Sequence, residues 1–186
     1  MPIELSRRQF TVEEYHRLAE SGVLKEDDRV ELIRGEILMM SPIGPRHAFR
    51  VSVISEVLTE RVGKAGRIWT QSPVVLDGRT EPQPDILILK RRDDHFREHL
   101  PDRSDVLLAI EVADTSLAYD RQVKRPLYSA AGVPEYWIVD VNENVLERHT
   151  GPRPDGYMHT DRLRPGDTVT LVALASITIP LSDLIG

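Results

Sequence analysis

Three short apolar segments place the strongest constraint on how this chain can fold. They span residues 86–89, 106–112 and 136–141, and Glu111 alone interrupts the second one with a charge. Segments of this length are too short for typical helices, and an apolar run without alternation is typical of a strand covered on both faces. The sequence therefore predicts a central sheet whose strands are buried between other layers.

Helical periodicity supplies candidates for those layers. Residues 10–19 begin with Thr11 and Glu14 at the spacing of a capping box. Residues 47–62 carry apolar side chains three and four positions apart, which indicates one buried helical face: Val51, Ile54, Leu58 and Val62.

A third helical pattern covers residues 116–131 and ends at Gly132. Ser116 is a candidate cap for its start, while Pro126 lacks an amide hydrogen and should kink or split the helix. Because these helical segments alternate with the apolar strands, we expect a mixed α/β fold in which helices pack on a central sheet.

Shorter strand-like segments extend this plan. Residues 29–40 are typical of a β-hairpin with Gly35 in its turn. Residues 68–71 and 74–76 are typical of short strands. The charged stretch 91–104 is expected to be a solvated connection. Towards the C-terminus, glycine and proline separate four short runs that predict a small antiparallel extension, namely residues 145–148, 156–159, 168–173 and 177–179.

Composition excludes several classes of site. The 186 residues include no cysteine, which excludes disulfides, thiolate metal sites and cysteine nucleophiles and favours a reducing compartment. The sequence shows no apolar run approaching eighteen residues and no signal-peptide pattern, so we expect a cytoplasmic protein without a membrane partner. No linker interrupts the chain, and we expect one domain over residues 1–186.

The charge balance constrains the partners of the chain. Thirty acidic and 24 basic residues give a net charge of −6. Domains that hold nucleic acid mainly through their overall field are usually basic, so this balance argues against that mode of binding. It does not argue against a metal site.

Two carboxylates stand at the buried strands. Asp85 follows Pro84 at the start of one, and Glu111 lies inside the next. A carboxylate in a buried strand is costly unless it is paired or binds a metal, and two of them on neighbouring strands can converge on a hard cation such as Mg²⁺. The alternatives are that Asp85 caps a turn and that Glu111 pairs with an arginine or lysine.

Pro84-Asp85 followed by Glu111-Val112 resembles the core motif of the PD-(D/E)XK phosphodiesterase superfamily, which has the restriction-endonuclease-like fold. The motif would place a lysine at position 113, where this chain has Ala113. In that superfamily the lysine can migrate to a neighbouring helix. Lys124 could take this role, because it shares one face of the third helical pattern with Asp120 and Tyr128.

A broader set of positions from about residue 10 to 140 is similar to the bacterial restriction endonuclease family of the Uma2 type. The most specific element is Gly132-Val133-Pro134-Glu135-Tyr136-Trp137-Ile138-Val139-Asp140, which we interpret as structural. The other matching positions are residues 31–36, 41–42, 47, 83–86, 110–112, 120, 124 and 128.

This resemblance implies a metal-dependent endonuclease that hydrolyses phosphodiester bonds of nucleic acid, with DNA as the expected substrate. Asp85 and Glu111 would bind Mg²⁺ or Mn²⁺, and the Val112 carbonyl could add a ligand. Lys124 would orient or deprotonate the attacking water and steady the phosphate. The alternative is that Lys124 pairs with Asp120 on an exposed helix face.

Further residues could assist. Glu31 is our choice for the additional acid that many enzymes of this superfamily bring from an N-terminal element, unless it points to solvent. His47 could contact phosphate or carry a proton, unless it is a solvated first-turn histidine. Residues 90–92, with Arg97 and Arg103, form a basic patch that could guide a phosphate backbone. No chemistry is assigned to four histidines in loop or edge contexts: His95, His99, His149 and His159.

Other functions remain open at this stage. Ala113 and the acidic balance suit a catalytically inactive domain of the same fold that binds nucleic acid or a protein partner. An acidic surface also suits a phosphodiesterase of small phosphate esters. A homodimer is a further expectation, because enzymes of this fold often use two subunits to cut two strands.

Overall fold

The centre of the structure is a six-stranded mixed sheet. The structure is a computed structural model that describes residues 7–25 and 27–186. β5 is parallel to β6, and the other neighbouring pairs are antiparallel. In spatial order the strands are β3 (Arg67–Thr70), β4 (Ile86–Leu89), β5 (Val106–Ala113), β6 (Glu135–Asp140), β7 (Val145–Thr150) and β8 (His159–Leu163). The three apolar segments therefore form the buried middle of the sheet, as predicted.

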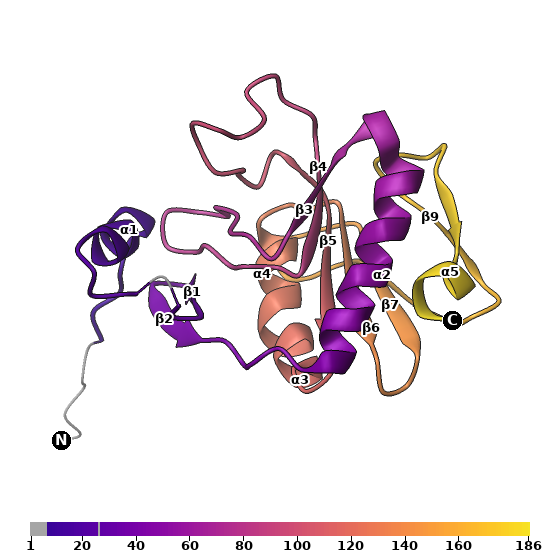
Figure 1. Ribbon diagram of the computed structural model, residues 1–186, viewed down its shortest axis with the longest axis horizontal. Helices are drawn as coiled ribbons and strands as arrows, with labels where there is room; N and C mark the ends of the chain where they lie inside the picture. Colours follow the sequence, from indigo (N-terminus) through magenta and orange to yellow (C-terminus); the bar gives the residue numbers. More distant parts are fainter. Residues whose placement is uncertain (1–6, 26) are drawn as a thin grey trace.

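Helices cover both faces of this sheet (Figure 1). On one face lies α2 (Pro45–Val62), which ends in the 3₁₀ turn η1 (Gly63–Ala65), together with α5 (Leu181–Ile185). The predicted apolar stripe of α2, from Val51 to Val62, is buried against the sheet. Within the described residues, no helix has the length and apolar character needed to cross a membrane.

The opposite face is covered by the segment that connects the parallel strands β5 and β6. It consists of α3 (Leu117–Tyr119), the π-helical segment η2 (Asp120–Lys124) and α4 (Arg125–Ala130). The split confirms the expectation for Pro126, which stands near the start of α4 where a missing amide hydrogen costs little. Ser116 occupies the predicted N-cap position of α3, and its hydroxyl donates to Asp120 Oδ2 at 2.6 Å rather than accepting a bond from the backbone.

The N-terminal elements form a separate unit beside the sheet (Figure 1). Helix α1 (Val12–Glu20) carries the predicted capping box, and β1 (Val30–Ile33) pairs with β2 (Glu36–Met39) as the predicted hairpin. Gly35 has a φ of +80° in the turn, and a Cβ there would lie 2.6 Å from Gln9 Cβ, so only glycine fits. Backbone bonds between Leu32 and Glu81 attach the hairpin to the rest of the chain.

One strand prediction needs correction. Residues 74–76 form no strand, and Val75 makes a single bridge to Asp102. The predicted antiparallel C-terminal extension is present, and its strands β7 and β8 continue the central sheet. β7 follows β6 after a four-residue turn and pairs along its free edge. A separate two-stranded sheet is formed by β9 (Thr168–Thr170) and β10 (Thr178–Pro180).

His149 lies in β7 and is fully buried, unlike the edge context that the sequence suggested. Its Nδ1 lies 2.9 Å from Thr160 Oγ1, its ring stacks on Tyr136, and its Nε2 has no hydrogen-bond partner among the described residues. Burial lowers the pKa of His149 to about 4, and the charge of Arg125 adds to this effect.

The protein is therefore expected to lose stability as the pH falls from about 6.5 to about 4. In this window the unfolded chain, whose histidine pKa is about 6.5, binds a proton that the folded chain does not, so the free energy of unfolding drops by up to about 3 kcal/mol. The His149→Phe variant should lose this dependence, whereas His159→Phe on the exposed strand β8 should keep it. Urea unfolding between pH 4 and 7 measures the effect, and equal acid sensitivity of wild type and His149→Phe would contradict it.

Candidate active site

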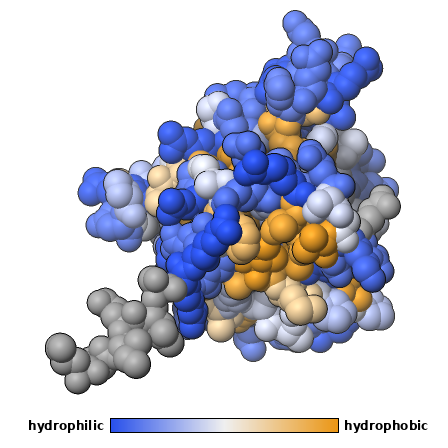
Figure 2. Space-filling view, turned by 90° about the vertical axis from the view of Figure 1, so that its left-hand side faces the viewer, coloured by the Kyte–Doolittle hydropathy of each residue, from blue (hydrophilic) through white to orange (hydrophobic). Residues whose placement is uncertain are grey.

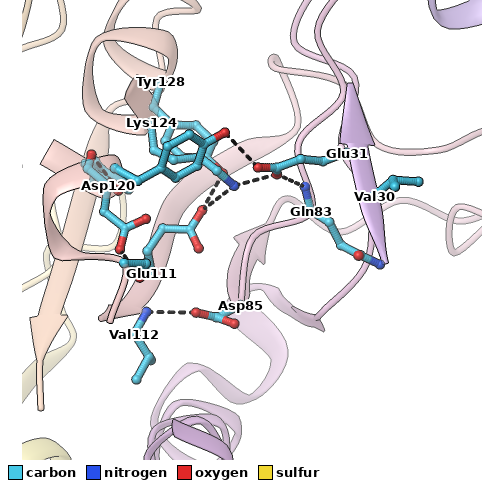
Figure 3. A network of polar contacts seen from close by, with 12 residues as sticks. Val30, Glu31, Gln83, Asp85, Glu111, Val112, Asp120, Lys124 and Tyr128 are labelled. Atoms are coloured by element: carbon cyan, nitrogen blue, oxygen red, sulfur yellow. Dashed lines mark hydrogen bonds and ion pairs between the residues drawn. The ribbon is translucent and has the colours of Figure 1, made fainter. Parts of the chain in front are cut away.

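Asp85 and Glu111 lie directly opposite each other on neighbouring strands. In the antiparallel pair, Ile86 faces Ile110, so the next position outward sets Asp85 against Glu111. Glu111 alternates along β5 with Ile110 and Val112, which pack on the α2 side, so its side chain projects to the face covered by α3, η2 and α4. The Val112 N–H donates to Asp85 Oδ2 at 2.8 Å. The register therefore places Asp85 beside Glu111, with the Asp85 carboxylate turned toward Val112 and the Glu111 carboxylate toward Lys124 (Figure 3).

Lys124 reaches this pair from η2 and not from the sheet. Its Nζ donates to Glu31 Oε2 at 2.7 Å and to Glu111 Oε1 at 3.2 Å, and the residue is only 3% exposed (Figure 3). The alternative that Lys124 pairs with Asp120 on an exposed helix face is therefore wrong. Ala113 lies two positions after Glu111 on the same face of β5 and is also buried. Because alanine has no charged group, the ammonium group at this site comes from Lys124 of η2.

Glu31 lies in β1 and is buried against this cluster. Its side chain is 4% exposed, so the alternative that it points to solvent is wrong. Besides the bond from Lys124, Glu31 accepts one from the Gln83 N–H at 3.2 Å and one from the Tyr119 hydroxyl at 2.9 Å. These contacts connect the N-terminal hairpin to the two elements that carry Asp85 and Lys124.

Two tyrosines complete the hydrogen bonding of the acids. Tyr128 Oη donates to Glu111 Oε1 at 3.1 Å, and Tyr119 Oη donates to Glu31 Oε1. Tyr128 shares the predicted helical face of Asp120 and Lys124, whereas Tyr119 lies outside that face. A tyrosine ring packs like an apolar side chain while its hydroxyl seeks a partner, so periodicity alone does not reveal this role.

The cluster carries more negative than positive charge. Burial raises the pKa of Glu111 well above its usual range, Lys124 opposes this shift, and Asp85, Asp120 and Glu31 add to it. Burial also raises the pKa of Asp120 to about 6. Burial lowers the pKa of Lys124, but the charges of Glu111 and Glu31 outweigh it, so the net shift is upward and Lys124 is an ammonium ion.

His47 lies in the first turn of α2 and contacts Asp85. Its Nε2 is 3.0 Å from the Asp85 carboxylate, its side chain is 15% exposed, and its buried Nδ1 has no hydrogen-bond partner among residues 7–25 and 27–186. The hydrogen bond to Asp85 raises the pKa of His47, and burial opposes this. The alternative of a solvated histidine is therefore wrong.

These groups line a cavity of about 550 Å³. One wall is made by residues 38–44, here called the strap, which run from the end of β2 to the start of α2. Among the described residues, the lining holds two permanent cations, Arg29 and Lys124. It also holds five carboxylates: Glu31, Asp85, Glu111, Asp114 and Asp120.

The predicted basic patch does not adjoin this cavity. Lys90 follows the far end of β4, five residues and roughly 16 Å from Asp85. Arg91 donates to the backbone oxygens of Gly63 and Gly66 near the end of α2, and Arg92 pairs with Asp94. The patch therefore lies at the opposite end of β4 from Asp85, and its role in guiding a phosphate backbone stays a prediction.

The oxygen donors of the cavity fit a hard divalent cation that is bound by few protein ligands. Asp85 and Glu111 offer carboxylate oxygens, and Glu111 Oε2 accepts no hydrogen bond from the described residues. The Val112 carbonyl faces the same side of its strand as the N–H that bonds Asp85. In the described part of the chain, no three His, Cys, Asp or Glu side chains are grouped as a complete metal cage. Mg²⁺ commonly binds through one or two carboxylates and keeps several waters, which matches this set.

Comparisons with known proteins agree with this fold. The family model Uma2, described as "Putative restriction endonuclease", matches residues 12–182. The crystal structure of a putative nuclease belonging to DUF820 from Anabaena variabilis is similar with a TM-score of 0.71 and 17% sequence identity, covering 95% of this chain and 97% of the other. None of the curated proteins compared with the chain matches it. The mixed α/β fold and the family resemblance predicted from the sequence are thus confirmed.

Proposed function

Because this chain belongs to the Uma2 family, we propose that it is a metal-dependent endonuclease that hydrolyses phosphodiester bonds of DNA. The observation that carries the proposal is the Lys124 ammonium held against Glu111, with Asp85 directly opposite, at the wall of an open cavity. A lysine beside two carboxylates supplies the charge that Ala113 lacks. This arrangement favours an active enzyme over an inactive domain of the same fold.

Asp85 and Glu111 are the proposed ligands of Mg²⁺ or Mn²⁺, with the Val112 carbonyl as a further ligand. Such a metal supplies a bound water of lowered pKa and stabilises charge on a phosphate oxygen. Lys124 has three N–H donors, of which Glu31 and Glu111 take two. The third is left to orient the attacking water or a phosphate oxygen. Glu31, Tyr119 and Tyr128 act as positioning residues that fix Lys124 and Glu111.

His47 is the proposed proton carrier of the site. It contacts Asp85 and lines the cavity, and an imidazole can gain or lose a proton close to neutral pH. A protonated imidazole beside the scissile phosphate can also contact a phosphate oxygen.

Cleavage of DNA by the wild-type protein is expected to require Mg²⁺ or Mn²⁺ and to stop when EDTA removes the metal. The Asp85→Asn variant should lose at least about a hundredfold in rate, because an amide oxygen is a poor substitute for a carboxylate ligand. Asp93→Asn, at an exposed residue beyond the far end of β4, is the matched control and should cleave like wild type. Gel assays on single- and double-stranded DNA measure the rates, with circular dichroism as the check on folding.

Two outcomes would contradict the proposal. Cleavage that continues in EDTA, or an Asp85→Asn variant as active as Asp93→Asn, would refute the proposed metal site. Hydrolysis of bis(p-nitrophenyl) phosphate without cleavage of any nucleic acid would instead support a phosphodiesterase of small esters.

A further inference from the structure

The strap gives the cavity an apolar wall. Its sequence, Leu-Met-Met-Ser-Pro-Ile-Gly, carries no charge, and all seven residues line the cavity. Met39 is 89% exposed and Ile43 is 41% exposed. Figure 2 shows that hydrophobic residues gather on the side of the molecule that carries α1 and the hairpin. Exposed apolar side chains at a cavity commonly mark a contact with a ligand.

The hairpin register brings this apolar wall next to the acids. Leu38 pairs with Glu31, so the two side chains lie next to each other on one face of the hairpin. Glu31 in turn contacts Lys124, which contacts Glu111. A molecule that fills the cavity therefore meets apolar side chains on one wall and a carboxylate–lysine cluster on another.

The charges around the cavity offer little to a phosphate backbone. Arg29 donates to the Ser41 carbonyl at 2.9 Å, and Lys124 is paired with two carboxylates. The basic stretch 90–92 lies at the far end of β4. Affinity for nucleic acid then needs a contact that does not depend on phosphate charge, and packing of a base on apolar side chains is such a contact.

We infer that the strap binds the base of an unpaired nucleotide while the adjoining phosphate lies at Asp85 and Glu111. This inference rests on the proposed function and narrows its substrate to single-stranded or locally unpaired nucleic acid. A cavity of about 550 Å³ has the size of small-ligand sites and admits a nucleotide, whereas a paired base cannot leave its stack to reach the strap without the cost of unpairing.

The test compares a fluorescein-labelled twenty-four-nucleotide DNA alone, annealed to its complement, and annealed with a central unpaired loop. The wild-type protein with Mg²⁺ is expected to cut the single strand and the loop at least about tenfold faster than the duplex. The double variant Met39→Ser/Ile43→Ser should raise KM for the single strand about tenfold and leave kcat within about twofold. Its matched control is Met158→Ser/Val172→Ser, at two exposed apolar residues away from the cavity, which should leave both constants unchanged.

Binding of the same DNA, followed by fluorescence anisotropy with Ca²⁺ in place of Mg²⁺, separates this inference from the proposed function. Weaker binding by the strap variant than by the control supports the strap whether or not cleavage occurs. Equal binding by the two variants, or equal cleavage of duplex and single strand, would overturn the inference and leave the proposed nuclease standing. Absence of any cleavage by wild type, with the binding difference retained, would refute the nuclease alone.

Discussion

Replacing Lys124 with methionine is expected to lower the free energy of unfolding by about 3–5 kcal/mol and to reduce DNA cleavage at least about a thousandfold. The variant leaves Glu31 and Glu111 buried without their cation, and an uncompensated buried charge is costly. It also removes the N–H groups proposed to orient water and phosphate. Thermal and urea unfolding measure the first effect, and gel assays well below the melting temperature measure the second.

Two further variants make the Lys124 prediction specific. Lys90→Met, at an exposed lysine, should change neither stability nor cleavage. The double variant Glu31→Gln/Lys124→Met should be more stable than Lys124→Met, because it has only one buried carboxylate without a cation instead of two. It should remain inactive. If Lys124→Met proved as stable as Lys90→Met, the ion pairs of the cluster would carry no net stability.

Replacing Glu135 with alanine is expected to lower the free energy of unfolding by about 3–5 kcal/mol with the site residues left in place. Glu135 is 1% exposed and accepts three bonds, from Trp137 Nε1 at 2.9 Å, Arg148 Nε at 2.6 Å and the Val172 N–H at 2.8 Å. The change leaves Arg148 without its partner and frees the loop that follows β9 from the sheet.

The control for this prediction is Glu143→Ala, at an exposed residue of the turn between β6 and β7. It should cost less than about 0.5 kcal/mol, as surface substitutions usually do. Urea unfolding at pH 7 compares the two variants. A Glu135→Ala protein as stable as Glu143→Ala would show that the three bonds are replaced by water without loss.

The features that follow from local pattern could be predicted. The apolar stripe of α2 and the apolar runs of β4, β5 and β6 place those elements correctly, because burial on a helix face or in a central strand leaves a recognisable apolar pattern in the sequence. The capping box of α1 and the break at Pro126 also act within a few residues. Asp85 and Glu111 stood out because a charge beside an apolar run needs a partner.

The features that depend on tertiary position could not be predicted. The site assembles residues from β1, β5, η2 and the position before β4, and the contact between Lys124 and Glu31 joins positions 93 residues apart. A periodic pattern does not tell which acid a lysine meets at that separation. For the same reason Lys90 and its neighbours seemed close to Asp85 in the sequence, although the intervening strand carries them to the opposite end of the sheet.

The hairpin that carries Glu31 is attached more lightly than the sheet that carries Asp85 and Glu111. α1 has no buried residue, and β1 and β2 form their own two-stranded sheet, joined to residues 79–81 by the backbone bonds of Leu32 and Gly35 and by burial of Leu32 and Ile33. A unit outside the central sheet can open locally at a lower free energy than the whole domain. Each such opening would take Glu31 away from Lys124 while the central sheet stays folded. The fraction of molecules with an intact site would then depend on local opening of the N-terminal unit, under conditions in which the rest of the domain is still folded.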